Sequence, residues 1–223
     1  MVTVRRRSSS RRRRIVSAAI VLLIAILIVV LRLVEDIGPE RRPSDRFVVA
    51  RIIDGDTIEL EGGDRLRLLA IDTPESGEPL YDEAAAMLRR MALGKTARIE
   101  FAGRRRDGYG RLLGYLYIDT LYINKAVIDS GLGYVYLFKD TDLDSPEIEM
   151  LLKAQIDAIN RDVGLWAIER EPEVVYYNKE GSFRLHRPGC SAVQNLEPGH
   201  YRVFHSREEG LATGLSPCRN CKP

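Results

Sequence analysis

The chain has 223 residues, of which 45% are hydrophobic and 30% charged, and this composition excludes a disordered protein and allows one ordinary domain with a smaller addition. Its net charge of +2 combines unlike segments: +7 in residues 1–14, −1 in 15–45, −7 in 46–173 and +3 in 174–223. All His and Cys lie between His186 and Cys221, which excludes Ser-His-Asp or Cys-His catalysis and His- or Cys-bound zinc from residues 46–173. Chemistry there must use carboxylates, Arg, Lys, Tyr or a hard cation bound by oxygen atoms.

An apolar run follows the seven arginines of residues 1–14. Residues 15–31 are apolar except Ser17, and the run resumes after Arg32 to residue 34. Twenty helical residues span about 30 Å, the thickness of the hydrocarbon layer. Arginines are retained on the cytoplasmic side. We therefore expect a cytoplasmic tail at 1–14 and a single transmembrane helix at 15–34, with the remaining chain outside the cell membrane.

Two other interpretations of this segment stay open. A cleaved signal peptide would give a secreted protein, but it needs small residues after the apolar core, where residues 31–35 are Leu-Arg-Leu-Val-Glu. An arginine-rich arm that binds nucleic acid is the second. Residues 35–46 are polar, with two Pro and one Gly, and are expected to form a linker.

Short strands alternate with helices after this linker. Patterns of period two predict strands within 47–53, 57–61, 65–71, 98–101, 111–118 and 134–138. Helices are expected at 80–93 and 124–130, and a longer one has Ser145 as N-cap, Pro146 at its first position and Gly164 at its end. The pattern predicts a β-rich α+β domain built on a small, partly open barrel.

Acidic residues gather where the first hairpin opens. If residues 61 and 65 lie opposite each other across the loop, Asp56 lies near residue 70 and Asp54 near Asp72, with Glu75 close by. Solvated turn residues would explain a single Asp-Gly pair. Four acids from two strand ends repel one another unless a positive group lies among them, which favours a bound hard cation.

Six short motifs follow one another along this part of the chain: Ile53-Asp54-Gly55-Asp56-Thr57, Arg67-Leu68-Leu69-Ala70-Ile71-Asp72-Thr73-Pro74-Glu75, Tyr81-Asp82-Glu83-Ala84, Asp107-Gly108-Tyr109-Gly110-Arg111, Asn124-Lys125-Ala126 and Gly164-Leu165-Trp166. In order and spacing they resemble the motifs of the staphylococcal nuclease (thermonuclease) family. The resemblance covers residues 47–168. It implies an OB-type five-stranded barrel with about three helices, and a nuclease that hydrolyses phosphodiesters of DNA and/or RNA with Ca²⁺.

The resemblance also implies which residues form the calcium site. By position, Asp56, Asp72 and the backbone carbonyl of Thr73 would bind calcium. Asp54 would lie behind these ligands without binding the ion itself. All four offer oxygen atoms, which calcium prefers.

The catalytic groups implied by the resemblance are Glu75, Arg67 and Arg111. Glu75 would position or deprotonate the attacking water, while the two arginines would hold the phosphate, whose charge guanidinium groups stabilise well. Tyr109 would lie along the nucleotide. A further family tyrosine fits Tyr136 and Phe138 equally.

One departure from the family is the charge of −7 over residues 46–173, because phosphate backbones favour basic surfaces. The loop of residues 104–106, Arg-Arg-Arg, is either a local source of positive charge or a solvated hairpin tip. Some relatives of this barrel bind partners without catalysis. A non-catalytic module that binds nucleic acid or protein is therefore the alternative function.

A second group of residues lies within 174–223. Two pairs, spaced as HxxxC and CxxC with 27 residues between them, comprise His186, Cys190, Cys218 and Cys221. Zinc takes four tetrahedral N or S ligands, and a small segment gains stability from such a metal. One disulfide would leave the third Cys unpaired, so we expect a zinc site. A disulfide and a redox-active CxxC pair are the alternatives. His200 and His205 are expected at the surface.

This segment is similar to the metal-binding domain of the Ada DNA-repair protein. That family binds zinc through Cys-Arg-Pro-x-Cys and Pro-Cys-x-x-Cys motifs. Here His186 replaces the first Cys, the thiolate that accepts a methyl group, so methyl transfer is not implied. The similarity implies a zinc-stapled module of charge +3 that can contact DNA. No protein partner is indicated by the sequence.

Overall fold

The computed structural model describes residues 25, 27, 46–195, 197 and 199–223. The chain divides into units 1–44 and 45–223, and every strand belongs to the second. The predicted tail, anchor and linker lie outside the described residues, apart from Arg46 and the helical Ala25 and Leu27. Among the residues that are described, no helix has the length and apolar character needed to cross a membrane.

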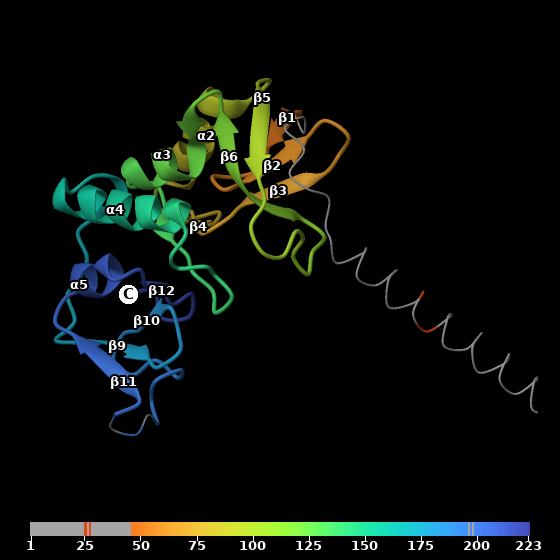
Figure 1. Ribbon diagram of the computed structural model, residues 1–223. Coiled ribbons are helices and arrows are strands. Elements are labelled where there is room, and N and C mark those ends of the chain that lie inside the picture. Colours follow the sequence, from red (N-terminus) through yellow and green to blue (C-terminus); the bar gives the residue numbers. More distant parts are fainter. Residues whose placement is uncertain (1–24, 26, 28–45, 196, 198) are drawn as a thin grey trace, which may run out of the picture. The chain divides into compact units, whose positions relative to one another are not determined.

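Five strands close into the predicted barrel (Figure 1). They pair in the order β3 (Arg65–Leu68), β2 (Thr57–Leu60), β1 (Arg46–Ile52), β5 (Thr96–Glu100) and β6 (Leu112–Ile118). A parallel pairing of β3 with β6 completes the ring. Of three further short strands, β7 (Leu121–Tyr122) extends this sheet from β6, while β4 (Ile71–Asp72) pairs with β8 (Tyr134–Val135) in a separate two-stranded sheet. The strand expected at 134–138 therefore has only two residues.

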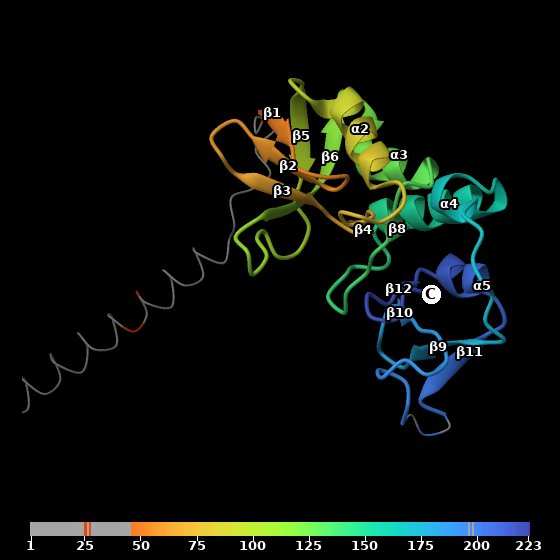
Figure 2. The same ribbon diagram turned by 180° about the vertical axis from the view of Figure 1, so that it is seen from behind.

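Three helices follow one another beside the barrel, as seen from both sides in Figures 1 and 2. They are α2 (Tyr81–Ala92), α3 (Ile123–Asp129) and α4 (Pro146–Asn160), which confirms the three predicted for this domain. The side chain of Ser145 accepts a hydrogen bond of 3.4 Å from Ile148 N, as expected for an N-cap. A 3₁₀ helix, Gly164–Trp166, ends the domain.

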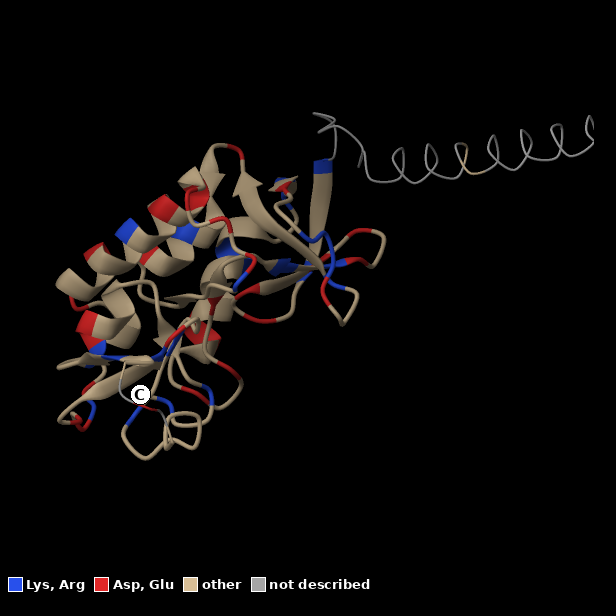
Figure 3. Cartoon of the chain, turned by 60° about the horizontal axis from the view of Figure 1, so that its bottom comes forward, with Lys and Arg blue, Asp and Glu red and all other residues tan. Residues whose placement is uncertain are grey.

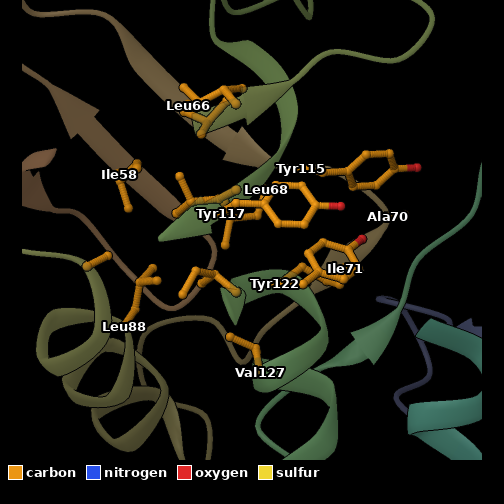
Figure 4. Packing of buried hydrophobic residues seen from close by; sticks show 14 of the residues in the cluster. Ile58, Leu66, Leu68, Ala70, Ile71, Leu88, Tyr115, Tyr117, Tyr122 and Val127 are labelled. Atoms are coloured by element: carbon orange, nitrogen blue, oxygen red, sulfur yellow. The ribbon is translucent and has the colours of Figure 1, made fainter. Parts of the chain in front are cut away.

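The barrel core is made of the alternate residues of its strands that point inward. Ile58, Leu66 and Leu68 of the strands are buried in one cluster, and Leu88 of α2 belongs to the same cluster (Figure 4). Each such side chain contributes about 1.5–3 kcal/mol by leaving water. Because alternate residues face opposite ways, burying Leu66 and Leu68 turns Arg67 to the outer face of β3.

The register of the β2–β3 hairpin differs from the predicted one. Thr57 pairs with Arg67, and a bond of 2.8 Å from Leu60 N to Asp64 O closes the turn. The two glycines at 62 and 63 both have positive φ, 97° and 90°, and Gly63 N donates to Leu60 O at 3.0 Å, so the loop comprises residues 61–63 and not 62–64. The expected pairing of residues 61 and 65 was therefore wrong by two residues, and it is the backbone of residue 68, not 70, that lies beside residue 56.

Residues 174–223 form two small sheets and a helix. Antiparallel β9 (Tyr176–Lys179) and β11 (Tyr201–Phe204) make one sheet, parallel β10 (Arg184–Leu185) and β12 (Ser216–Pro217) the other, and α5 (Arg207–Ala212) packs beside them. Their apolar side chains share a cluster with two residues of the preceding domain: Ala158, Trp166, Tyr176, Leu185, Phe204, Leu211 and Leu215. Gln155 of α4 joins the segments by accepting from Val135 N (2.7 Å) and donating to Leu211 O (2.6 Å).

Candidate active site

Asp56 lies at the centre of the site and is only 6% exposed. It precedes β2, in a turn where Ile53 N donates to Thr57 O at 2.9 Å. Its Oδ2 accepts hydrogen bonds from Thr73 N at 2.9 Å and Thr73 Oγ1 at 3.1 Å. Its Oδ1 accepts from Thr57 Oγ1 at 3.0 Å. The structure thus brings together two of the residues predicted to bind calcium.

Arg67 joins the two predicted carboxylate ligands. Its Nε lies 3.1 Å from Asp56 Oδ1 and its Nη2 lies 2.8 Å from Asp72 Oδ1. Its Nη1 donates to the carbonyls of Leu68 and Ile71, both at 2.7 Å. The guanidinium therefore supplies the positive group that the clustered carboxylates require.

The carboxylates at this centre are desolvated and close together. Burial raises the pKa of Asp72, although Arg67 opposes the shift. Burial and the neighbouring Asp56 raise the pKa of Asp54, whose Oδ1 accepts a hydrogen bond from Asp56 N at 3.0 Å. This bond places Asp54 next to Asp56, and its role behind the calcium ligands stays a prediction. A cluster of anionic oxygens that favours added positive charge fits a hard divalent cation.

Arg111 is held by its own loop. Its Nε lies 2.8 Å from Asp107 Oδ2, while Asp107 Oδ1 accepts from Tyr109 N at 2.9 Å and Arg111 N at 3.0 Å. Burial opposes ionisation of Asp107, but the hydrogen bonds from Arg111 hold its pKa below the usual value. Tyr109 is 89% exposed, with its ring centre 5.5 Å from the Arg111 guanidinium. A groove beside this loop is lined by Gly63, Asp64, Arg65, Tyr109, Gly110 and Arg111.

Of the two predicted phosphate-binding arginines, Arg67 lies on β3 and Arg111 lies in the loop directly before β6, the parallel neighbour of β3. Arg67 lies opposite Leu113 in the parallel β3–β6 pair, and Arg111 is two residues before Leu113. Both therefore occupy the outer face of the barrel. Arg111 pairs with Asp107, however, and among the described residues it forms no ion pair with the central carboxylates. Glu75 is largely exposed beside this centre, with 65% of its side chain accessible.

Comparison with known proteins identifies the family. The model of the staphylococcal nuclease homologue family matches residues 65–168. An uncharacterized endonuclease of Escherichia coli is 33% identical over 123 residues, which cover 53% of this chain and 75% of that protein. The chain belongs to the staphylococcal nuclease homologue family.

Two further relatives agree with this assignment. The thermonuclease of Staphylococcus intermedius is 29% identical over 151 residues, 61% of this chain and 88% of the relative. An uncharacterized protein of Bacillus anthracis is 33% identical over 132 residues, and the match spans 60% of its length. The matches confirm the predicted nuclease domain and the class of hydrolytic endonuclease. The family model ends at residue 168, so the similarity of residues 174–223 to the Ada domain stays a prediction.

Two residues that the sequence did not assign also reach the nuclease site. Arg219 Nη2 lies 2.9 Å from Asp72 Oδ1 and 3.4 Å from Glu75 Oε1. The Arg219 guanidinium is 5.6 Å from the ring centre of Tyr136, whose backbone N donates to Ala70 O at 2.9 Å. Tyr136 thus lies at the site, whereas sequence alone could not choose between it and residue 138. The one sequence signal for Arg219 was its place inside the CxxC pair.

The predicted zinc ligands form one cluster in the C-terminal segment. One ligand atom each from His186, Cys190, Cys218 and Cys221 lies within 4.8 Å of all the others. All three Cys are free thiols, and His186 Nδ1 lies 3.4 Å from Cys190 Sγ. Burial raises the pKa of the Cys221 thiol to about 12. The donor set fits a tetrahedral metal ion such as zinc.

The other two histidines are placed as predicted. His200 and His205 are exposed and lie outside the cluster of four. His200 instead has its Nδ1 3.3 Å from Glu180 Oε2 at the surface. Neither one is positioned to complete the metal site.

Proposed function

We propose that this protein is a calcium-dependent nuclease that hydrolyses phosphodiester bonds of DNA and/or RNA. The observation that carries the proposal is the junction of Asp56, Asp72 and Arg67, two desolvated carboxylates held by one guanidinium. This junction provides oxygen ligands for a cation beside an arginine that can bind phosphate. A barrel that only binds partners has no need to keep this charge arrangement in a partly buried place.

The protein groups divide the reaction between them. Arg67 and Arg111 bind the anionic oxygens of the phosphodiester, where paired guanidinium hydrogen bonds are strong. Glu75, with its carboxylate exposed to solvent, orients a water molecule and accepts its proton at a carboxylate oxygen. The oxygen of that water bonds to phosphorus while the bond to the leaving oxygen breaks.

Calcium is proposed to bind Asp56, Asp72 and the carbonyl of Thr73. When bound, it supplies a positive charge that stabilises the charge developing on the phosphate. The chain keeps this place ready, because Thr73 N and Oγ1 fix the orientation of Asp56. Arg67, freed from neutralising both carboxylates, then has N–H groups available for the phosphate.

The charge of the nuclease domain is compatible with an anionic substrate. Figure 3 shows acidic and basic residues interspersed along the described chain. Arg106 of the 104–106 loop pairs with Asp64 at 3.0 Å, which ties that loop to the rim of the groove near Arg111. We propose that this loop supplies positive charge to the substrate path.

Nicking of supercoiled plasmid, and degradation of a labelled RNA, test the proposal. The purified protein is expected to cut at least one of them with calcium, and to stop when a calcium chelator is added. Asp56→Asn is expected to reduce cutting strongly, because it removes a charged ligand. Retention of nucleic acid without cutting by the wild-type protein would instead support the non-catalytic binding module.

We also propose that residues 15–34 anchor the enzyme in the cell membrane, with residues 1–14 cytoplasmic and the nuclease outside. The arginine-rich start and the apolar run support this orientation. Sedimentation with membranes and sensitivity of intact cells to added protease would be expected. A mature N-terminus near residue 35 would contradict the anchor and support secretion.

For the C-terminal segment we propose a structural zinc ion and an Ada-like module. The cluster of one His and three Cys supports zinc, and the charge of +3 supports contact with nucleic acid. Elemental analysis of the reduced, purified protein should find about one zinc per chain. Protein without zinc would contradict this proposal.

A further inference from the structure

A loop of the metal cluster contacts the nuclease site through two cations. Arg219 pairs with Asp72 and Glu75, and Lys222 Nζ lies 2.6 Å from Glu78 Oε1. Both cations lie more than 140 residues from their partners along the sequence. Opposite charges therefore face each other where the C-terminal segment meets the active site.

The cluster fixes the backbone on both sides of Arg219. Cys218 and Cys221 flank it, and Lys222 N donates to Cys218 O at 2.8 Å. Cys221 Sγ accepts a hydrogen bond from Arg187 N at 3.3 Å. A metal ion bound by both Cys would hold this short loop in one conformation. The position of the Arg219 side chain then depends on that metal.

Arg219 can bind a further anion. Its side chain is 59% exposed, and in the described part of the chain its ion pairs with Asp72 and Glu75 both use Nη2. A guanidinium carries five N–H donors, so Nε and Nη1 remain for a ligand. Tyr136 lies beside it, and the guanidinium of Arg184 lies over the same ring at 3.6 Å from its centre, so a second positive group is close to Arg219 at this edge of the site.

We propose that Arg219 is a third phosphate-binding arginine of the nuclease site, supplied by the C-terminal segment and positioned by its His–Cys₃ metal cluster. It binds a phosphate of the nucleic acid strand next to the phosphate that is cleaved. The inference rests on the proposed nuclease function and extends it. It makes substrate binding depend on a metal that takes no part in the chemistry.

The test compares Arg219→Ala with the wild-type protein in binding a single-stranded phosphorothioate oligonucleotide, followed by fluorescence anisotropy with calcium present. We expect the Kd to rise about tenfold, the effect of one lost charge-assisted hydrogen bond. In cleavage assays KM should rise more than kcat falls. Arg219→Lys should recover part of the affinity. Lys179→Ala, which removes one charge from an exposed position of the same segment, should leave the Kd unchanged.

The role of the metal is tested with Cys221→Ser. We expect this variant to lose zinc and to weaken oligonucleotide binding as Arg219→Ala does, and adding Arg219→Ala to it should change the Kd less than about twofold. If the effects of Cys221→Ser and Arg219→Ala on the Kd are fully additive, Arg219 acts independently of the cluster, and the proposed link is overturned. This conclusion holds even where Cys221→Ser loosens the segment.

An unchanged oligonucleotide Kd for Arg219→Ala would overturn the assignment of Arg219. If calcium bound more tightly to this variant at the same time, Arg219 would only compete with calcium for Asp72. Absence of cleavage by the wild-type protein would instead refute the proposed function. The binding measurement separates the two, since it needs no turnover.

Discussion

Arg67 shows how one residue serves two states of the site. Its side chain is 13% exposed, and those of Asp56 and Asp72 are 9% and 16% exposed, so all three charges are largely desolvated. Removing one member of such a group leaves uncompensated charge and costs about 3–5 kcal/mol. The arginine is therefore expected to stabilise the calcium-free fold as well as to bind phosphate.

Calcium should reveal this dual role in Arg67→Ala. In the variant, the two carboxylates repel each other until a cation binds between them. We expect a lower Tm than that of the wild-type protein without calcium, and a larger rise in Tm when calcium is added. Thermal unfolding in both conditions measures this. An equal rise in Tm for the two proteins would contradict a calcium site at these carboxylates.

Asp107 gives a pH-dependent prediction at the same scale. Its pKa is lowered below 3.8 in the fold, so it contributes stability above that value, and the contribution is lost as pH falls through the folded pKa. Asp107→Asn keeps an oxygen for Tyr109 N and Arg111 N but removes the charge facing Arg111. We expect a loss of less than about 1 kcal/mol near pH 7, and a smaller loss at an acid pH below the folded pKa, where Asp107 is protonated in both the folded and the unfolded chain. Chemical denaturation at both pH values measures it, and a loss that persists undiminished in acid would refute the ion-pair explanation.

At the scale of elements, the barrel follows from patterns visible in the sequence. Alternating apolar residues predicted β1, β2, β3, β5 and β6, and Ser145 with Pro146 predicted the start of α4. Alternation did not predict the register of the β2–β3 hairpin, because the backbone conformation of the two glycines at 62 and 63 decides that register. Asp56 and Asp72 lie close together despite the different register, because both pair with Arg67.

Gly55 lies in the turn before β2, where this turn packs against α2 and Thr73. A Cβ there would lie 2.7 Å from both Ala84 Cβ and Thr73 Oγ1, so the turn must have glycine to pack against α2 and Thr73. Gly55→Ala is expected to push Thr73 away from Asp56 and to weaken calcium binding about tenfold or more. Isothermal titration with calcium measures this. Gly108→Ala is the control, because a Cβ there meets nothing within 4 Å and Gly108 is not among the glycines with positive φ. Wild-type calcium affinity in Gly55→Ala would show that the turn does not position the ligands.

At the scale of the whole unit 45–223, the C-terminal segment is packed against the nuclease domain. Arg207 is 4% exposed, donates to Tyr134 Oη at 2.7 Å and lies over the Trp166 ring. Sequence patterns predicted the metal ligands of this segment, because their spacing is local. They could not predict that Arg219 meets Asp72, because that contact depends on how α5 and its neighbours pack on α4.

Removal of zinc should therefore affect the nuclease domain. We expect a zinc chelator with little affinity for calcium to lower the Tm of the whole unit in one transition, because both parts share a core. Restoring zinc should restore the Tm. Two separate transitions, with the upper one unaffected by zinc, would contradict the shared core. Differential scanning calorimetry distinguishes the results.

The central claim is that Arg67, Glu75 and Arg111 carry out phosphodiester hydrolysis beside a calcium site formed by Asp56 and Asp72. The most direct measurement is the calcium-dependent rate of plasmid nicking by the wild-type protein and by Arg67→Ala, Glu75→Ala and Arg111→Ala, with folding checked by circular dichroism. The account predicts a loss of about tenfold or more in each folded variant. Near-normal turnover in all three would contradict it.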